Sequence, residues 1–157
     1  MKNVINFFAY GELMNKDIFS QHGLECLART TVTLSAWKVV FNRIPKEKDS
    51  PEGLGLTNIE PTPDSDGMLY GVLYEMDDSF LPRLDEIHNY PEETLRKVFR
   101  FTRHDFNMVN GFAYVARPEN TATGLKPSKA IKKTLKSCKP DLPMLYFSRM
   151  MNVRTID

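Results

Sequence analysis

The stretch FFAYGELMN, residues 7–15, sets how the N-terminal part of the chain folds. It continues the run VINFFA (residues 4–9), which is almost wholly apolar and rich in β-branched and aromatic side chains. That pattern predicts a strand covered on both faces, and therefore central in its sheet. Asn15 is placed to cap a short helix over about residues 16–22. The chain thus passes from strand to helix through a short loop that opens with a Tyr-Gly pair.

This loop, residues 10–14, is the first candidate for ligand binding. A strand that ends at a glycine just before a helix exposes several backbone N–H groups in succession, and such a nest suits a carboxylate or phosphate. Gly11 also lets a ligand approach the backbone closely. Equally, Gly11 can serve only the β-to-α turn, and the negative charge of Glu12 repels an anion unless that side chain points away. Both interpretations remain open from the residues alone.

Length and composition indicate a single globular domain. The chain has 157 residues, 41% apolar and 26% charged, and its 21 basic and 20 acidic side chains nearly cancel. This near-neutral total lacks a polyanion-binding signature, so a nucleic-acid partner is not expected. Two cysteines, Cys26 and Cys138, are too few for a disulfide scaffold. No apolar segment approaches the roughly 20 residues of a membrane-spanning helix, and the N-terminus is a poor signal peptide. We expect a soluble, cytoplasmic protein.

The remaining chain alternates strand and helix patterns without repeats or a linker. These patterns predict one α+β domain over residues 1–157, with a mixed, largely antiparallel sheet, a core over about 4–117 and a helical segment over about 127–150. The expected elements are one or two strands over 30–42, two strands around the turn-rich EPTPDSDG (60–67), a helix over about 79–89, and a hairpin from 98–104 and 111–117.

The predicted helix over residues 79–89 carries a candidate proton-transfer group. At 3.6 residues per turn, Phe80, Leu84 and Ile87 share one face. Glu86 lies roughly 200° from Leu84 and should face water, whereas His88 lies only about 40° from Leu84 and borders the buried face. His88 is therefore placed to act in a pocket. The alternative, a histidine that satisfies the C-terminal carbonyls of its helix, stays open.

The C-terminal part is rich in lysine. Six lysines and no acidic residue lie between Lys126 and Lys139, and the spacing predicts an amphipathic helix with a solvated basic side. Binding to an anionic partner is an open alternative, against which stand the near-neutral total and the lack of interleaved aromatics. The other histidines, His22 and His104, have no partners at ligand spacing, so no metal site is predicted.

Five short stretches, in order, carry a family resemblance. They are Tyr10-Gly11-Glu12-Leu13-Met14, Trp37-Lys38-Val39-Val40-Phe41-Asn42, Gly55-Leu56-Thr57-Asn58-Ile59, Gly71-Val72-Leu73-Tyr74-Glu75-Met76 and Leu84-Asp85-Glu86-Ile87-His88-Asn89. In order and approximate spacing, the chain resembles the γ-glutamylcyclotransferase family, including its AIG2-like branch. The resemblance implies a small closed or nearly closed β-barrel flanked by helices, with one pocket.

The resemblance also implies a chemistry that needs no metal or organic cofactor. In active members the amides of the first stretch hold the α-carboxylate of a γ-glutamyl substrate, and a glutamate acts as general base. The freed α-amine then attacks its own γ-carbonyl and releases 5-oxoproline. By this resemblance the expected substrate-binding residues of this chain are Tyr10, Gly11, Glu12, Leu13, Met14 and Asn58.

The chain departs from the family pattern at the residues that carry the chemistry. The loop serine is Glu12 here, the catalytic glutamate is His88, and the glycine after it is Asn89. Histidine, with an unperturbed pKa of about 6.5, can serve as a base near neutral pH. We therefore predict His88 and Glu12 as catalytic residues that border one pocket, within reach of each other directly or through a water molecule.

Three functions follow from these observations. The first is a γ-glutamylcyclotransferase-like enzyme, and the second is an inactive member that retains the pocket and binds a small carboxylate ligand. The third is an interaction protein that acts through the lysine-rich segment, residues 127–139. The sequence does not specify the amine that leaves or the oligomeric state, and we expect the loops 44–54 and 118–126 to line the leaving-group end of the pocket.

Overall fold

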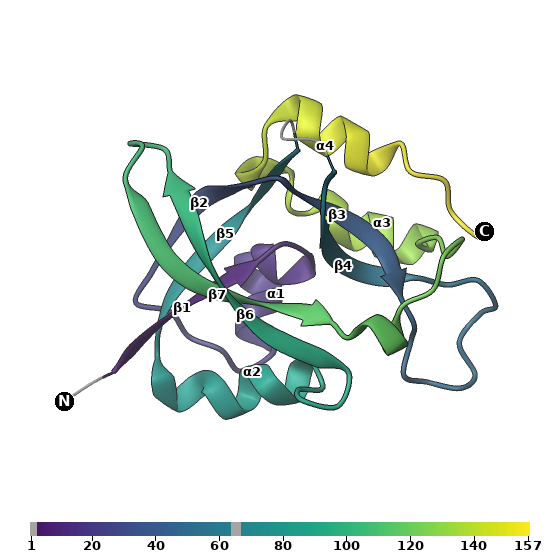
Figure 1. Ribbon diagram of the computed structural model, residues 1–157, viewed down its shortest axis with the longest axis horizontal. Coiled ribbons are helices and arrows are strands. Elements are labelled where there is room, and N and C mark those ends of the chain that lie inside the picture. Colours follow the sequence, from purple (N-terminus) through teal and green to yellow (C-terminus); the bar gives the residue numbers. More distant parts are fainter. Residues whose placement is uncertain (1–2, 64–66) are drawn as a thin grey trace.

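The N-terminal apolar run forms the first strand of a closed barrel in this computed structural model, which describes residues 3–63 and 67–157 (Figure 1). Strand β1 (Val4–Ala9) pairs antiparallel with β5 (Met68–Asp77) along its whole length. Successive side chains of β1 enter different hydrophobic clusters, Phe7 one and Phe8 the other. The strand is thus covered on both faces, which confirms the prediction from its continuous apolar pattern.

Five strands close the barrel in the order β1-β5-β2-β6-β7. Besides β1 and β5, these are β2 (Ala28–Ser35), β6 (Thr94–Arg103) and β7 (Met108–Ala116). The seam between β1 and β7 is parallel and the other pairs are antiparallel. This confirms the predicted small, mixed, largely antiparallel barrel. The β6–β7 hairpin extends further than predicted, because the pairing continues back to Thr94 opposite Ala116.

A second, two-stranded sheet packs beside the barrel. The β-branched stretch around residues 30–42 divides at Ala36, whose φ is 66°, into β2 and the separate strand β3 (Trp37–Arg43). Strand β3 pairs antiparallel with β4 (Leu56–Pro61). The long loop that joins them extends away from the barrel in Figure 1. Part of the predicted turn EPTPDSDG, residues 64–66, lies outside the described residues.

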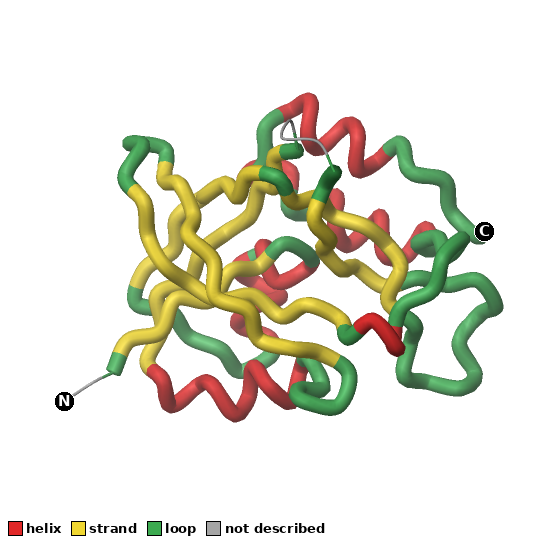
Figure 2. Tube along the Cα trace, viewed as in Figure 1, coloured by secondary structure: helices red, strands yellow, loops and turns green. Residues whose placement is uncertain are grey.

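Helices surround the barrel on several sides (Figure 2). The side chain of Asn15 accepts hydrogen bonds from the N–H groups of Asp17 and Ile18, so the predicted N-cap is confirmed. The predicted helix over residues 79–89 is shorter, because a 3-10 turn precedes it and His88 ends it. The helices are α1 (Lys16–Gln21), α2 (Leu81–Ile87), α3 (Lys129–Lys136) and α4 (Met144–Met151), and the 3-10 turns are η1 (Glu12–Met14), η2 (Asp78–Phe80), η3 (Pro118–Asn120) and η4 (Lys139–Asp141).

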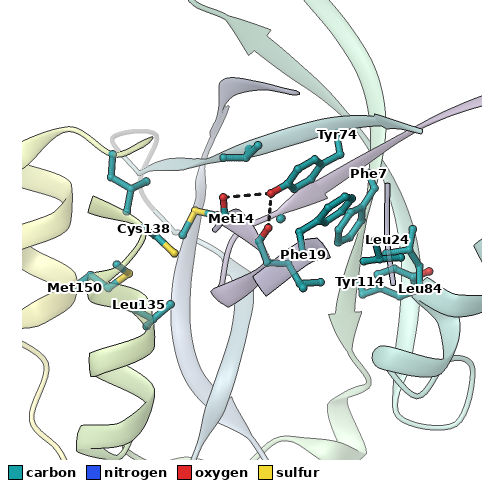
Figure 3. Packing of buried hydrophobic residues seen from close by; sticks show 14 of the residues in the cluster. Phe7, Met14, Phe19, Leu24, Tyr74, Leu84, Tyr114, Leu135, Cys138 and Met150 are labelled. Carbon is teal, nitrogen blue, oxygen red and sulfur yellow. Dashed lines mark hydrogen bonds between the residues drawn. The ribbon is translucent and has the colours of Figure 1, made fainter. Parts of the chain in front are cut away.

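Polar groups beneath the first loop hold it against the core. The Tyr74 hydroxyl lies 2.6 Å from the carbonyl oxygen of Leu13 and 3.2 Å from that of Met14, as Figure 3 shows. Burial raises the pKa of Tyr74 to about 12, so the hydroxyl remains a donor. Arg29 donates to the Met14 carbonyl at 2.7 Å and pairs with Asp141 at 3.1 Å. These contacts fix the loop from its buried side and link it to the C-terminal segment.

The lysine-rich segment packs as an amphipathic helix. In α3, Leu135 is buried in the same cluster as β1, and Ile131 packs against that cluster. Its lysines Lys129, Lys133 and Lys136 are exposed. Among the described residues, no helix is both long enough and apolar enough to cross a membrane.

Candidate functional site

A cavity of about 580 Å³ opens at the end of β1. This volume lies within the range of roughly 300–1,000 Å³ that small-molecule sites occupy. Its walls come from the end of β1 and the turn after it, the ends of β3 and β4, the C-terminus of α2 and one face of α3. The site therefore brings together segments from the whole length of the chain.

The turn after β1 presents backbone donors at this cavity. Residues 10–13 all line it. The N–H of Met14 donates to the carbonyl of Gly11 at 3.0 Å and closes the turn. The N–H groups of Glu12 and Leu13 come before this bond, at the start of a helical turn, where a helix offers no internal acceptor. Two consecutive residues of the cavity wall thus carry N–H groups without an acceptor inside the turn.

Gly11 is not needed here for an unusual backbone angle. Its φ is −121°, outside the left-handed region that favours glycine. A Cβ built at Gly11 would lie 3.5 Å from Cγ2 of Thr57, which also lines the cavity, and this distance is ordinary van der Waals contact. The absence of a side chain at Gly11 therefore leaves room between the turn and Thr57, in the space that a ligand needs.

Glu12 lines the cavity and lies near His22. Its carboxylate lies 3.8 Å from Nε2 of His22, and its side chain is 54% exposed. Because this carboxylate is exposed to water, its repulsion of an anion bound at the turn is reduced by the high dielectric constant of the solvent. Glu12 and His88 both line the cavity.

His88 occupies the point where α2 ends. Its Nδ1 lies 2.8 Å from the carbonyl oxygen of Leu84. Because a carbonyl can only accept, Nδ1 must carry the hydrogen, and Nε2 of the neutral ring is then an acceptor. The capping interpretation of His88 is confirmed by this bond. The same residue also lines the cavity, so capping and exposure to the cavity coexist.

Aromatic rings enclose the imidazole. The His88 ring stacks on Tyr114 at 4.0 Å with an interplanar angle of 5°, and it meets Phe7 edge-on at 5.6 Å. The Tyr114 hydroxyl donates to Asp85 at 2.6 Å, and Asp85 pairs with Arg96 at 3.3 Å. The stacking ring is therefore anchored by its hydroxyl, which limits how far the imidazole can tilt.

The enclosure changes the acidity of His88. Its pKa is lowered from 6.5 to about 4, chiefly by burial and to a smaller degree by the positive charges of Arg43 and His22, while the hydrogen bond to Leu84 acts in the opposite direction. At neutral pH the ring is therefore uncharged, with Nε2 free of a proton.

The sequence analysis missed the ion pair on this cavity. Nη2 of Arg43 lies 3.2 Å from Oε2 of Glu93 and 3.3 Å from the carbonyl oxygen of His88. Both side chains line the cavity, and they are only 16% and 17% exposed. The available signal was an arginine as the last residue of β3, where a charged side chain marks the point at which the strand leaves the core.

Two predicted binding residues lie away from the cavity lining. Met14 is fully buried in the hydrophobic core, and its polar contacts come from its backbone, through the N–H to Gly11 and the carbonyl to Tyr74 and Arg29. Asn58 is buried as well, and its amide donates to Asn42 at 2.9 Å and accepts from the N–H of Ala116 at 2.9 Å. On this strand the cavity-lining residues are Leu56 and Thr57 instead. The reason is the alternation of a strand, which turns neighbouring side chains to opposite faces.

The prediction that the loops 44–54 and 118–126 line the leaving-group end of the cavity is correct only in part. Lys46 and Glu47 from the loop over residues 44–54 line the cavity, in line with the prediction. The loop over residues 118–126 is not among the lining segments. One face of α3 takes this place, with Ala130, Ile131, Thr134 and Leu135. Nothing in the local pattern of α3 distinguishes a face that packs on a core from one that borders a cavity.

Comparisons with known proteins agree with this architecture. The family described as "Gamma-glutamyl cyclotransferase, AIG2-like" matches residues 7–132. Among solved structures, a protein named γ-glutamyl cyclotransferase is similar with a TM-score of 0.83 at 18% identity, over 99% of this chain and 90% of that one. An uncharacterised human protein is similar with a TM-score of 0.80 at 18% identity, over 98% and 90%.

A more distant structure extends the comparison. A yeast γ-glutamyl cyclotransferase specific to glutathione has a TM-score of 0.65 at 10% identity, over 94% of each chain. No curated protein sequence matches this chain at a significant level. At these identities the structural likenesses establish the fold, while the family match covers most of the chain. The chain belongs to the γ-glutamyl cyclotransferase, AIG2-like family.

Proposed function

We propose that this protein converts a γ-glutamyl amine or peptide into 5-oxoproline and the free amine. The α-amine nitrogen attacks the γ-carbonyl carbon, a five-membered ring forms, and the amide bond to the leaving amine breaks. The proton lost by the attacking nitrogen is matched by the proton that the leaving amine gains. The observation that carries this proposal is that one cavity is lined by turn residues whose N–H groups have no acceptor among the described residues and by a neutral imidazole.

In this proposal the turn after β1 holds the glutamyl α-carboxylate. The N–H groups of Glu12 and Leu13 are the donors, and the missing side chain of Gly11 leaves space for the carboxylate near Thr57. Backbone donors fixed by a folded turn need no reorganisation when the anion arrives. The contacts of Tyr74 and Arg29 with the carbonyls of this turn keep it rigid.

His88 is the proposed proton acceptor. An α-amine attacks only after it has lost the proton of its ammonium form. Nε2 of His88 carries no hydrogen, and we propose that it accepts this proton. With a pKa of about 4, this nitrogen is unprotonated at neutral pH but weakly basic. An ordinary α-amine has a pKa of about 7.7–8.0, so proton transfer is uphill by about four units. We therefore expect slower turnover than a base with a pKa near 7 gives.

Folding of the substrate supplies much of the remaining acceleration. The reaction is intramolecular, so a cavity that holds the glutamyl chain bent brings nitrogen and carbon into contact without a second binding event. Phe7 and Phe8 from β1 and Leu135 from α3 give the cavity apolar walls for the methylene groups. Glu12 is proposed to assist from the far side of the turn, together with His22.

A second candidate function is a binding protein without turnover. The observation that favours it is the low pKa of His88, combined with the use of Nδ1 for capping α2. In this case the family's carboxylate base is missing and the cavity binds a γ-glutamyl compound or a related carboxylate unchanged.

The direct test is release of 5-oxoproline from γ-glutamyl substrates. We would incubate the wild-type protein, His88→Ala and the matched control His104→Ala with γ-glutamyl amines and peptides, with glutathione included because the yeast neighbour is named for it. His104 lies on the β6–β7 hairpin, away from the cavity lining. Release by wild type and His104→Ala that His88→Ala reduces by roughly 10²-fold or more supports catalysis by His88.

The variant His88→Glu separates the two candidate functions. It restores the carboxylate that the family resemblance implies at this position. Turnover that appears only in His88→Glu, with ligand-dependent thermal stabilisation of the wild type, supports the binding protein. Release that is unchanged in His88→Ala contradicts the role of His88.

A further inference from the structure

The guanidinium of Arg43 is only partly used by the protein. Both of its hydrogen bonds to described residues leave from Nη2, one to Glu93 and one to the carbonyl of His88. Nε of Arg43 is buried, and no partner for it exists among the residues that the structure describes. A buried N–H without a partner costs free energy. Because Nε is closed to solvent, a ligand in the cavity can reach the guanidinium only at its terminal nitrogens, on a side chain that lines the cavity.

Charge on the cavity wall is mixed. The described lining holds two cations, Arg43 and Lys46, and four carboxylates, Glu12, Glu47, Glu86 and Glu93, so an anionic group on the ligand is attracted only where it meets the cations. Arg43 lies beside the proposed base, with Nη2 3.3 Å from the carbonyl oxygen of His88, and it lines the same cavity as Tyr10. Arginine binds a carboxylate through two parallel N–H bonds, and such pairs are stronger than neutral hydrogen bonds.

A γ-glutamyl compound offers one carboxylate to the turn amides, so Arg43 is left for a second one. We propose that Arg43 binds a carboxylate on the leaving amine and thereby selects γ-glutamyl amino acids over γ-glutamyl amines that lack this group. This inference rests on the proposed function, since it takes the glutamyl carboxylate to be held by the turn. Arg43 is a specificity-determining residue in this account and takes no part in proton transfer.

Glu93 is the counter-ion of Arg43 when no ligand is bound. Its carboxylate accepts a hydrogen bond from Nη2 of Arg43. The same Nη2 also donates to the carbonyl of His88, and the two bonds keep the guanidinium at the cavity wall. A ligand carboxylate that approaches Arg43 meets repulsion from Glu93. Neutralising Glu93 should therefore strengthen binding of a substrate that carries the second carboxylate. A purely structural ion pair predicts no such gain.

Two substrates differ in this group alone. In γ-glutamylalanine the leaving amine bears a carboxylate, and in γ-glutamylethylamine a hydrogen replaces that carboxylate. We would measure KM and kcat by 5-oxoproline release, and ligand-dependent thermal stabilisation in parallel, for both compounds. The wild type should prefer γ-glutamylalanine by roughly ten-fold or more, as expected for a charge-assisted hydrogen bond.

The variants are Arg43→Met and Glu93→Gln, each with a matched control. Lys38→Met removes a paired cation from the same strand β3 outside the cavity lining, and Glu92→Gln removes the neighbouring, exposed carboxylate. Arg43→Met should abolish the preference for γ-glutamylalanine by raising KM for that compound, with KM for γ-glutamylethylamine within about two-fold. Loss of the Arg43 charge beside His88 also raises the pKa of that ring, and a change in kcat from this cause should affect both compounds alike. Glu93→Gln should lower KM for γ-glutamylalanine alone. Both controls should behave as the wild type does.

The outcomes separate this inference from the proposed function. Turnover with equal use of both compounds by the wild type, or a preference that survives Arg43→Met, overturns the role of Arg43 and leaves the enzyme proposal intact. Weakening of both compounds to the same degree by Arg43→Met overturns it too, since Arg43 then holds the glutamyl carboxylate. An Arg43-dependent preference in thermal stabilisation without release of 5-oxoproline supports the carboxylate site and overturns the catalytic proposal.

Discussion

His88 combines a structural task with exposure to the cavity. Its Nδ1 satisfies the carbonyl of Leu84 at the end of α2, and its ring is held by Tyr114. Asn89, which follows it, has φ of 51°, a left-handed conformation common at helix C-termini. The family pattern has a glycine at this position, and asparagine is the residue that adopts this conformation most readily after glycine. Asn89 at the end of α2 therefore takes a conformation that glycine also adopts readily.

The lowered pKa of His88 makes stability depend on pH. The unfolded ring takes up a proton below about pH 6.5, whereas the folded ring does so only near pH 4. Unfolding therefore binds a proton in this window, and the free energy of unfolding falls as the pH is lowered from 6.5 to 4. The shift corresponds to a loss of about 3 kcal/mol. Denaturant unfolding across this range should show a steeper decline for wild type than for His88→Gln, whereas parallel curves contradict the lowered pKa.

Asn58 is expected to stabilise the fold without binding substrate. Both ends of its buried amide are engaged, with Asn42 and with the backbone of Ala116. Asn58→Ala leaves these buried groups without partners and should lower the free energy of unfolding by about 2–4 kcal/mol. Denaturant unfolding measures this loss. In the folded fraction KM for a γ-glutamyl substrate should stay unchanged, and a selective rise in KM would restore Asn58 to the binding site.

For single residues, the sequence predicted which side chains border the site more readily than it predicted the residues that contact them. Helical periodicity placed His88 beside the buried face of α2 and Glu86 in water. Glu86 is 74% exposed, but it also lines the cavity, which the periodicity did not predict. The sequence did not separate Thr57 from Asn58, since that requires knowing which face of β4 borders the cavity. The pair of Arg43 and Glu93 joins residues 50 positions apart, and no local pattern reports such a contact.

Among the elements, strand β1 and the turn after it set the position of the site. The capping side chain of Asn15 and the continuous apolar run of β1 were both readable in the sequence, because each depends on residues next to it in the chain. The extent of the β6–β7 hairpin was not, because its early pairing at Thr94 depends on Ala116 across the strand. Local chemistry fixes the starts of elements, and tertiary pairing fixes how far they run.

Stability should respond differently when a methyl group is added at Gly71 in β5 and at Gly11 in the turn after β1. At Gly71 a Cβ would overlap the carbonyl oxygen of Ala9 and the ring of Phe8, where β5 crosses β1. Gly71→Ala should therefore cost about 3 kcal/mol in the free energy of unfolding. At Gly11 the methyl group meets only Thr57 at ordinary contact distance, so Gly11→Ala should stay within about 1 kcal/mol of wild type.

The same pair tests the role of the turn. Gly11→Ala places its methyl group in the space proposed for the glutamyl carboxylate, so KM should rise although the protein is folded. Denaturant unfolding and 5-oxoproline release on the two variants separate these effects. A Gly11→Ala variant with wild-type KM would show that no ligand approaches the turn there.

For the whole molecule, the cavity depends on segments that only the completed fold brings together. The turn after β1, the end of α2 and one face of α3 meet at it, and Arg29 ties the first loop to Asp141 near the C-terminal helices. The family resemblance predicted the barrel, and it predicted residues 10–13 and His88 at the cavity. The α3 wall did not, because a helix face reads the same in sequence whether it covers a core or a cavity.

The central claim is that the turn amides and His88 act on one ligand in one cavity. A crystal structure of the protein with 5-oxoproline tests it most directly. We predict the ligand carboxylate within about 3.2 Å of the N–H nitrogens of Glu12 or Leu13, with the ring nitrogen beside Nε2 of His88. A carboxylate that sits on Arg43 instead, or a ligand bound outside this cavity, contradicts the account.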